Sequence, residues 1–333
     1  MGLFFAIFSR IYLYFRLSMQ QDLKKAYVQL HLAVFIFGFT AILGKLIQAD
    51  HFTLVWHRMW IAALGFLFVP GFISSLKFVS MRQLLMLGGI GVLVALHWLS
   101  FYGSIKIGNS ASLTLGCFGL TSAFTSVLEP LIYRKRFVLL DVLLGLMALV
   151  GIVIIAWFAP DQNDVSGNYS LAIIVGVVST FLAALFSTLN STLTNTIDTK
   201  VISFAELGGG FLFLSILLVM GFGMDGVLET STFQAFPLSN ADGLLGHYSD
   251  VLWILLLAIV CTNIAFVLNL NAMKKLSAFT ANLAINLEPV YGIILAALFF
   301  NEHQFLNWQF YIGASVILLS VIIHSILKYR GKH

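Results

Sequence analysis

The sequence predicts an all-α integral membrane protein, with ten transmembrane helices that form two five-helix repeats of inverted topology. Hydrophobic residues make up 60% of the 333 residues and charged residues only 10%, whereas soluble domains carry about 25% charged residues. Apolar runs long enough to cross about 30 Å of hydrocarbon as helices recur along the whole chain. A β-barrel would instead show short segments of alternating polarity.

Polar residues, or Gly, Pro and Asn, separate ten apolar segments, and each segment is a candidate helix. We expect the first repeat at residues 27–158 and the second at 170–328, with a linker at 159–169 and a cytoplasmic tail at 329–333. The ten expected helices are 27–47, 54–73, 83–105, 110–133, 138–158, 170–196, 203–222, 251–273, 277–300 and 306–328.

Residues 1–26 form a separate N-terminal segment in this scheme, apolar and aromatic but interrupted by Arg10 and Arg16. We expect a cytoplasmic or interfacial helix that lies along the membrane, with its basic residues toward the lipid headgroups. An alternative is that translation starts at Met19, because the sequence MQQDLKK that begins there is polar and basic.

Basic residues predict the orientation of the chain. All but three of the 18 Lys and Arg residues fall on one side of the membrane when the ten helices alternate in direction. Lys106 falls on the other side, and Lys45 and Arg58 lie within helices. Because loops rich in Lys and Arg stay in the cytoplasm, we expect a multi-pass protein with both termini cytoplasmic. The expected location is the plasma membrane, most simply the bacterial inner membrane.

Two Leu-Glu-Pro tripeptides, at 128–130 and 287–289, invite a direct alignment of the two halves, but another register fits better. Aligning NSASLTLG with LSAFTANL pairs Ser110 with Ser277, an offset of 167 residues. Glu288 and Pro289 then correspond to Thr121 and Ser122. Halves with an odd number of helices enter the membrane in opposite directions, which makes an inverted repeat of the kind found in many secondary transporters.

Glu288 is the first candidate site residue, because it lies near the middle of the helix expected at 277–300. A charged carboxylate at the bilayer centre costs about 2.5 to 3.5 kcal/mol on insertion scales, so such residues are functional candidates. Pro289 lacks the N–H group of a helical hydrogen bond and predicts a kink beside the acid. Glu288 is either a coupling acid that takes up a proton, an anchor for a substrate ammonium group, or a neutral acid hydrogen-bonded to another helix.

His97, Trp98 and Tyr102 form an aromatic cluster within the helix expected at 83–105. Such a cluster could close over an organic cation or a flat group through its ring faces, or simply pack against other helices. His97 is polar at mid-membrane depth, which makes it the stronger candidate of the three.

Polar residues in three further helices are candidates for a binding cavity. Asn282 and Asn286 share one helix face, and either a cavity role or an interhelical hydrogen bond fits them. Ser187 and Asn263 lie mid-span and are better placed to line a cavity than the other polar residues of their helices.

Arg58 and Lys45 lie toward the same non-cytoplasmic mouth, where they could attract a carboxylate or extend to the headgroups. Glu206 precedes three glycines near the cytoplasmic side, a pattern typical of a closely packed helix start. We expect Glu129 to pair with the basic residues at 134–136.

No cofactor or metal is expected. Cys117 and Cys261 both lie within expected helices, so the chain offers no disulfide framework and no CxxC metal motif. The net charge of +4 arises from short loops, which fits membrane orientation and not nucleic-acid binding. The expected partners are a small-molecule substrate, the lipid bilayer and a second copy of the chain as a homodimer.

The run NLEPVYGIILAALFFNEHQFLNWQFYIGASVILLS resembles the closing helices of EamA-type transporters of the drug/metabolite transporter (DMT) superfamily. The shared features are a mid-helix proline at Pro289, an acid after the ninth helix at Glu302, and a glycine in the last helix. The resemblance implies a central cavity lined by helices 1 to 4 and 6 to 9, with helices 5 and 10 outside. The first half departs from the pattern, with Lys135 where an acid often stands and Ser122 where a proline often stands.

These observations favour a secondary transporter, an exporter of small organic metabolites such as amino acids, that works by alternating access with coupling through Glu288. A P-loop GxxxxGK[ST] is missing from the sequence, which argues against ATP drive within this chain. The alternative is an intramembrane lipid-modifying enzyme. The chain has neither an HExxH nor a GxSxG motif, so the prediction is that it is not an enzyme.

Overall fold

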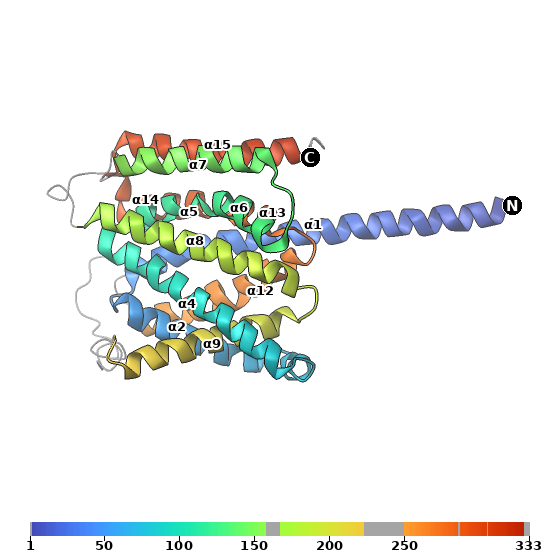
Figure 1. Ribbon diagram of the computed structural model, residues 1–333, viewed down its shortest axis with the longest axis horizontal. Coiled ribbons are helices and arrows are strands. Elements are labelled where there is room, and N and C mark those ends of the chain that lie inside the picture. The colour runs from blue at the N-terminus through green and yellow to red at the C-terminus, as the bar shows by residue number, and fades with distance from the viewer. Residues whose placement is uncertain (1, 158–166, 223–249, 286, 305, 330–333) are drawn as a thin grey trace.

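The computed structural model describes residues 2–157, 167–222, 250–285, 287–304 and 306–329. Every regular element in these ranges is a helix, and none is a strand (Figure 1). The predicted all-α class is therefore confirmed for the described part of the chain. The helices of the first half are α1 (Gly2–Leu46), α2 (His51–Gly65), η1 (Phe66–Phe68), α3 (Phe72–Leu76), α4 (Met81–Gly108), α5 (Ala111–Phe118), α6 (Thr121–Tyr133) and α7 (Leu139–Trp157).

The second half repeats this order. The helix predicted at 251–273 contains a π-helical segment, a feature often found at functional sites. Most of the predicted linker and tail, residues 158–166 and 330–333, lies outside the described residues. The helices are α8 (Tyr169–Leu193), α9 (Thr199–Val219), α11 (Asp250–Ala258), η3 (Ile259–Ile264), α12 (Ala265–Met273), α13 (Ala278–Ile285), α14 (Glu288–Phe300), η4 (Glu302–Gln304) and α15 (Trp308–Tyr329).

Six helical stretches are long and apolar enough to cross a membrane, and three shorter apolar helices accompany them. The helical ranges overlap all ten predicted segments, but ten membrane crossings remain a prediction. The six long stretches are Gln21–Leu46, Met81–Gly108, Ala111–Tyr133, Tyr169–Leu193, Thr199–Val219 and Asp250–Met273.

Polar side chains define where several helices begin. Ser80 accepts a hydrogen bond from the backbone N–H of Gln83 (3.3 Å), and the Gln83 side chain returns to the Ser80 backbone (2.9 Å), which forms a capping box at α4. Asn168 caps α8 and Asp198 caps α9 in the same way. These caps satisfy backbone N–H groups that the first turn of a helix leaves without partners.

The N-terminal segment is continuous with the first predicted span, and its place along the membrane stays a prediction. Helix α1 runs without a break from Gly2 to Leu46 and extends beyond the rest of the bundle (Figure 1). At about 1.5 Å per residue its 45 residues span roughly 68 Å. No Gly or Pro occurs between Gly2 and Gly38, so nothing in the sequence separates an interfacial helix from the first span.

The two halves break their fourth helix at equivalent positions. In the first half α5 ends at Phe118 and α6 begins at Thr121, and in the second half α13 ends at Ile285 and α14 begins at Glu288. Each boundary differs from its counterpart by the predicted offset of 167 residues. Both second segments end in a left-handed residue, Arg134 at φ 51° and Asn301 at φ 52°.

Helix packing follows the same repeat. Helix α1 packs on α12 as α8 packs on α4, and α1 packs on α14 as α8 packs on α6. The broken helices cross head to tail, because α5 packs on α14 and α6 packs on α13. Helices α7 and α15 pair in opposite directions at one side of the bundle, and α1 begins and α15 ends at the same end (Figure 1). This arrangement matches two repeats of inverted topology.

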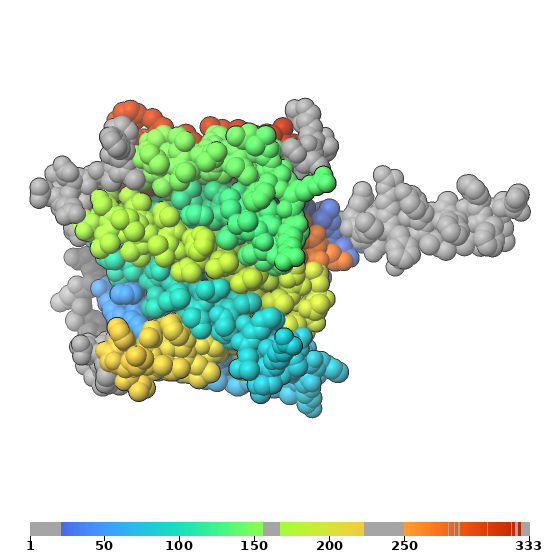
Figure 2. Space-filling model, viewed as in Figure 1, coloured from blue at the N-terminus to red at the C-terminus, as the bar shows by residue number. Residues whose placement is uncertain are grey.

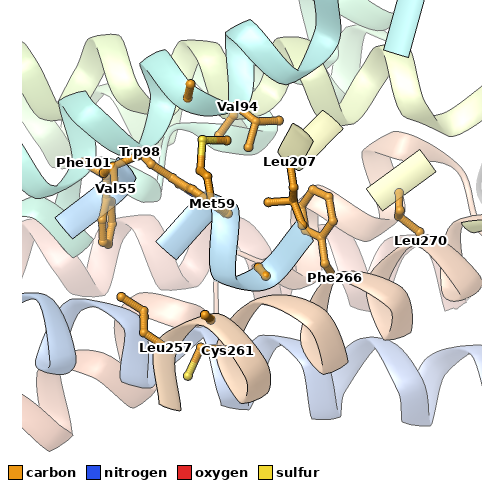
Figure 3. Close-up of a cluster of buried hydrophobic side chains, with 14 of the residues drawn as sticks. Val55, Met59, Val94, Trp98, Phe101, Leu207, Leu257, Cys261, Phe266 and Leu270 are labelled. Carbon is orange, nitrogen blue, oxygen red and sulfur yellow. The ribbon is translucent and has the colours of Figure 1, made fainter. Parts of the chain in front are cut away.

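The main core lies between these layers, where α1, α2, α4, α9 and α12 meet. Figure 3 shows Met59 of α2, Leu207 of α9 and Phe266 of α12 within this buried cluster. A smaller cluster joins α5, α7, α8 and α15. Figure 2 shows α4, α7, α8 and α9 packed side by side on one face of the molecule.

Candidate functional site

A cavity lies between the two halves, and its empty volume of about 620 Å³ includes space that is open to solvent. Both repeats contribute to its wall, and within the described residues α7, α9 and α15 contribute nothing to it. The wall therefore combines ends of the four half-helices with parts of five other helices. The half-helices are α5, α6, α13 and α14, and the other helices are α1, α2, α4, α8 and α12. The lining residues are Phe37, Thr40, Arg58, His97, Trp98, Phe101, Phe118, Thr121, Ala183, Phe186, Ser187, Phe266, Asn269, Asn282, Ile285 and Glu288.

The two helix breaks meet at this cavity. Phe118 and Thr121 flank the first break, Ile285 and Glu288 flank the second, and all four line the wall. Broken helices place unpaired backbone groups at a site, and the N-terminus of a helix favours negative charge. Beside the acid the helix is interrupted by a turn at Leu287, and Pro289 lies in the first turn of α14, where its missing N–H removes no helical hydrogen bond.

Arg58 supplies the positive charge of the cavity. Its Nε donates to Oγ1 of Thr262 (2.8 Å) and its Nη1 to the hydroxyl of Tyr102 (2.7 Å). Its guanidinium carbon lies 3.6 Å from the centroid of the Trp98 ring, a cation–π distance. The remaining nitrogen, Nη2, has no hydrogen-bond partner among the described residues.

The alternative that Arg58 extends to the headgroups is wrong. The residue is only 2% exposed, and its hydrogen bonds reach α4 and η3. Helix α2 begins at His51, before the predicted start at residue 54, so Arg58 lies about two turns inside the helix.

Glu288 supplies an acidic group. It is 4% exposed, in the first turn of α14, and Arg58 is the charged group that acts on it electrostatically. No described residue forms a hydrogen bond or ion pair with its carboxyl group. The cavity therefore holds a buried acid and a buried base that do not contact each other directly.

His97 lines the cavity but is held by α8. Its Nδ1 lies 3.0 Å from the carbonyl oxygen of Ser179 and 2.9 Å from the Ser179 hydroxyl, which also donates to the His97 carbonyl oxygen (3.0 Å). The ring packs among Phe101, Phe118 and Phe186. His97 thus joins α4 to α8 and also lines the cavity.

Ser187 and Asn282 form a hydrogen-bonded polar pair in the wall of the cavity. The Ser187 hydroxyl donates to Oδ1 of Asn282 (2.7 Å), and Nδ2 of Asn282 donates to Oγ1 of Thr125 (2.8 Å). These bonds join α8, α13 and α6 across the two repeats. The interhelical hydrogen bond considered for Asn282 is present, and the residue lines the cavity as well.

Three predicted site residues that the structure describes do not line the cavity. Tyr102 lies behind Arg58 as its hydrogen-bond partner, and Pro289 is buried in the first turn of α14. Asn263 lies on η3 with its amide against Gly65 of α2, and its Oδ1 has no hydrogen-bond partner in the described part of the chain. Asn286 lies outside the described residues. Arg58, His97, Trp98, Ser187 and Glu288 line the same cavity, and their role in substrate binding stays a prediction.

Other lining residues carried weaker signals in the sequence. Thr40 is an isolated polar residue in the apolar C-terminal part of α1, a pattern that could have identified it. Phe37 and Phe186 could not be distinguished, because the chain contains 31 phenylalanines.

Lys45 does not join Arg58 at the cavity. Its Nζ lies 2.7 Å from Oε1 of Glu302 and donates to the carbonyl oxygen of Asn109 (2.8 Å). The Glu302 carboxylate also accepts from the backbone N–H groups of Ala111 and Ser112, each at 3.0 Å. Glu302 therefore caps α5 and joins the second repeat to the first, at the end away from the cavity centre.

Glu302 lies in η4, between the helices, and its pKa reflects these bonds. Burial by itself would raise the pKa, but the Lys45 ammonium and the Ser112 N–H hold the pKa of the carboxyl group below its usual value. At the opposite end Glu129 forms the expected ion pair with the basic segment, 2.7 Å from Nζ of Lys135.

The described residues contain no group of three or more His, Cys, Asp or Glu side chains arranged to hold a metal ion. The cavity combines opposite charges, amide groups and aromatic walls. This arrangement can bind a small molecule that carries both an anionic and a cationic group beside an apolar part.

Comparison with known proteins agrees with this fold. The family model of the "EamA-like transporter family" matches residues 24–157 and 170–326, one match for each half of the chain. A crystal structure of a protein that is 15% identical in sequence superposes with a TM-score of 0.63, covering 93% of this chain and 99% of that chain. That likeness shows the fold alone, and a search of curated proteins finds no match. The chain belongs to the EamA-like transporter family.

Proposed function

We propose that the protein is a secondary transporter that exports small zwitterionic metabolites, such as amino acids, by alternating access. The observation that carries this proposal is the pair of buried, opposite charges in one cavity. Nη2 of Arg58 has no hydrogen-bond partner in the described structure. Neither oxygen of the Glu288 carboxyl group has one there either. Buried charges without partners are costly, so their retention points to a ligand that completes them.

A zwitterion matches this pair. A carboxylate accepts hydrogen bonds from the planar edge of a guanidinium group, and an ammonium group pairs with a carboxylate. The two protein charges are separated by more than the 4 Å of an ion pair, which leaves room for the ligand between them. Trp98, Phe118 and Phe186 form apolar walls for a side chain.

Polar contacts between the repeats at both ends of the bundle support alternating access. At one end Lys45 pairs with Glu302, and Asp250 accepts from the backbone N–H of Gln48 (2.9 Å). At the other end Ser75 donates to Asp198 (2.7 Å). Each set would open in turn while the other stays closed, as the repeats rock about the central site. We further propose that the end holding both termini faces the cytoplasm.

Proton coupling through Glu288 is part of the proposal. An acid that pairs with a substrate ammonium group when ionised, and takes up a proton when the substrate leaves, links the two movements. Membership of a transporter family favours a transporter over the alternative of an intramembrane lipid-modifying enzyme.

The test is uptake of radiolabelled amino acids into proteoliposomes under an imposed pH gradient, with wild-type protein and Glu288→Gln. We expect Glu288→Gln to lose the response to the gradient and most of the flux, because it can neither ionise nor exchange a proton. Glu129→Gln is the matched control, because Glu129 belongs to the other Leu-Glu-Pro tripeptide and pairs with Lys135 at a helix end. If Glu288→Gln kept full flux and full response to the gradient, the coupling role would be abandoned.

A further inference from the structure

A second buried acid lies outside the cavity, on α9. Glu206 is 0% exposed, and neither of its carboxyl oxygens has a hydrogen-bond donor among the described residues. It forms no ion pair within 4 Å in that part of the chain. A buried carboxylate without donors is strongly disfavoured, so this environment requires a positively charged species or a proton at the group.

Asn190 on α8 is the polar side chain that meets Glu206. Its Oδ1 is also buried without a hydrogen-bond donor. Three acceptor oxygens, two from Glu206 and one from Asn190, thus lack donors in one place. A proton on the carboxyl group turns one of the Glu206 oxygens into a donor, and the side-chain amide of Asn190 is the polar group beside it.

The charged neighbours of α9 do not supply a counter-ion. Helices α3, α8 and α12 contain no acidic or basic side chain. Among the groups on α2 and α4, Arg58 bonds to Tyr102 and Thr262, and His97 bonds to Ser179. The complete set of basic groups on these two helices is His51, His57, Arg58, Arg82, His97 and Lys106.

The backbone of α9 packs unusually closely on α4 at this position. A Cβ atom at Gly91 would overlap the backbone of Glu206, and a Cβ atom at Gly209 would overlap that of Gly88. Glycines at a helix crossing let the backbones touch and exclude water. The next residue, Leu207, belongs to the same buried cluster as Phe266, which lines the cavity (Figure 3).

We propose that Glu206 and Asn190 form a proton-binding site, separate from Glu288, that is loaded when α9 is closed against α4 and empties when the two helices part. On opening, the O–H bond of the Glu206 carboxyl group breaks, its electron pair stays on the carboxylate, and water takes the proton. The reverse step neutralises the acid before α9 closes again. The site makes the α4–α9 contact depend on proton concentration, and it adds a second proton to each conformational cycle.

Difference infrared spectroscopy of purified protein in lipid nanodiscs, in H2O and D2O at neutral pH, tests this proposal without any substrate. The wild-type minus Glu206→Gln spectrum is expected to contain the C=O stretch of a protonated carboxyl group. The frequency of this band should shift only slowly after transfer to D2O, because a buried group exchanges its proton slowly. The wild-type minus Glu129→Gln spectrum is the control and should lack that stretch, because Glu129 pairs with Lys135. Ionised carboxylate bands for Glu206 would overturn the proposal.

Asn190→Ala provides a second test if Glu206→Gln does not fold. Loss of the acceptor oxygen should shift the protonated-carboxyl stretch of the wild-type protein to higher frequency, and an unchanged stretch would overturn the pairing. Neither spectrum depends on transport, so failure of the proposed transport function and failure of this site give different results.

Discussion

Glu288 and Glu302 lie in the same stretch of sequence, and both are buried, at 4% and 3% exposure, yet their surroundings are opposite. Glu302 accepts hydrogen bonds from the Lys45 ammonium, the Ser110 hydroxyl and two backbone N–H groups. Glu288 accepts none from any described residue and faces Arg58 across a cavity.

The difference separates a structural acid from a candidate binding acid. A buried carboxylate that is fully hydrogen-bonded fixes the elements around it, in this case η4 and the start of α5. A buried carboxyl group without donors keeps its bonding capacity for a ligand or a proton. Both acids attracted attention in the sequence, and only their neighbours in three dimensions distinguish them.

Among the variants that test this comparison, Arg58→Gln is expected to have the largest effect, a loss of amino-acid affinity. Loss of the guanidinium group removes the partner of a substrate carboxylate, and charge-assisted hydrogen bonds of this kind are worth about 1.5 to 3 kcal/mol. Amino-acid affinity should therefore fall by about 10- to 100-fold, measured by isothermal titration calorimetry. Arg82→Gln, at the exposed start of α4, is the control and should bind as wild type does.

Arg58→Lys should also bind poorly. An ammonium group cannot stack on Trp98 and reach both Tyr102 and Thr262 as the planar guanidinium does. Full affinity in Arg58→Lys would show that the charge alone matters and that the planar geometry at Trp98 does not.

Glu302→Gln should instead reduce stability, by about 2 to 3 kcal/mol, because it leaves the Lys45 ammonium half-buried without its ion pair. Thermal unfolding of purified protein measures this, and the ligand affinity of the folded protein should change little. Asp22→Asn is the control, since the ion pair of Asp22 with Lys275 (3.4 Å) is half-exposed and should contribute about 0.5 kcal/mol or less. Equal stability of Glu302→Gln and wild type would remove the distinction between the two acids.

The same interaction predicts a smaller, pH-dependent effect. The pKa of Glu302 is lower in the folded protein than the usual value of about 4.3, so the folded state favours the ionised form. Its contribution to stability is complete above the usual pKa and is lost as the pH falls through the lower, folded value. The melting temperatures of wild type and Glu302→Gln should therefore differ by a constant amount above about pH 5 and converge below it. A difference that grew toward acid pH would contradict this assignment.

Much of the architecture could be predicted because it depends on local composition and spacing. Apolar runs indicated the helices, and the offset of 167 residues placed Thr121 opposite Glu288, where both half-helices begin. The first break could not be foreseen, since it has no proline, and Gly119 and Leu120 differ little from residues inside other helices.

The candidate site was predicted in part, for a physical reason. Polarity at mid-membrane depth identified Glu288, His97 and Ser187. The partners of Arg58 come from helices far apart in the sequence, and spacing along one helix does not reveal such contacts. The pairing of Lys45 with Glu302 could not be predicted for the same reason. From the sequence, Lys45 was expected beside Arg58.

The most direct test of the central claim compares a zwitterionic ligand with derivatives that each lack one of its two charges. Purified protein would be titrated with a zwitterionic amino acid, its N-acetyl derivative, which lacks the ammonium group, and its amide, which lacks the carboxylate, with thermal stabilisation as the readout. If Arg58 and Glu288 bind the two ends of one substrate, only the zwitterion should stabilise the protein strongly. Equal stabilisation by all three ligands, or by none, would contradict the account.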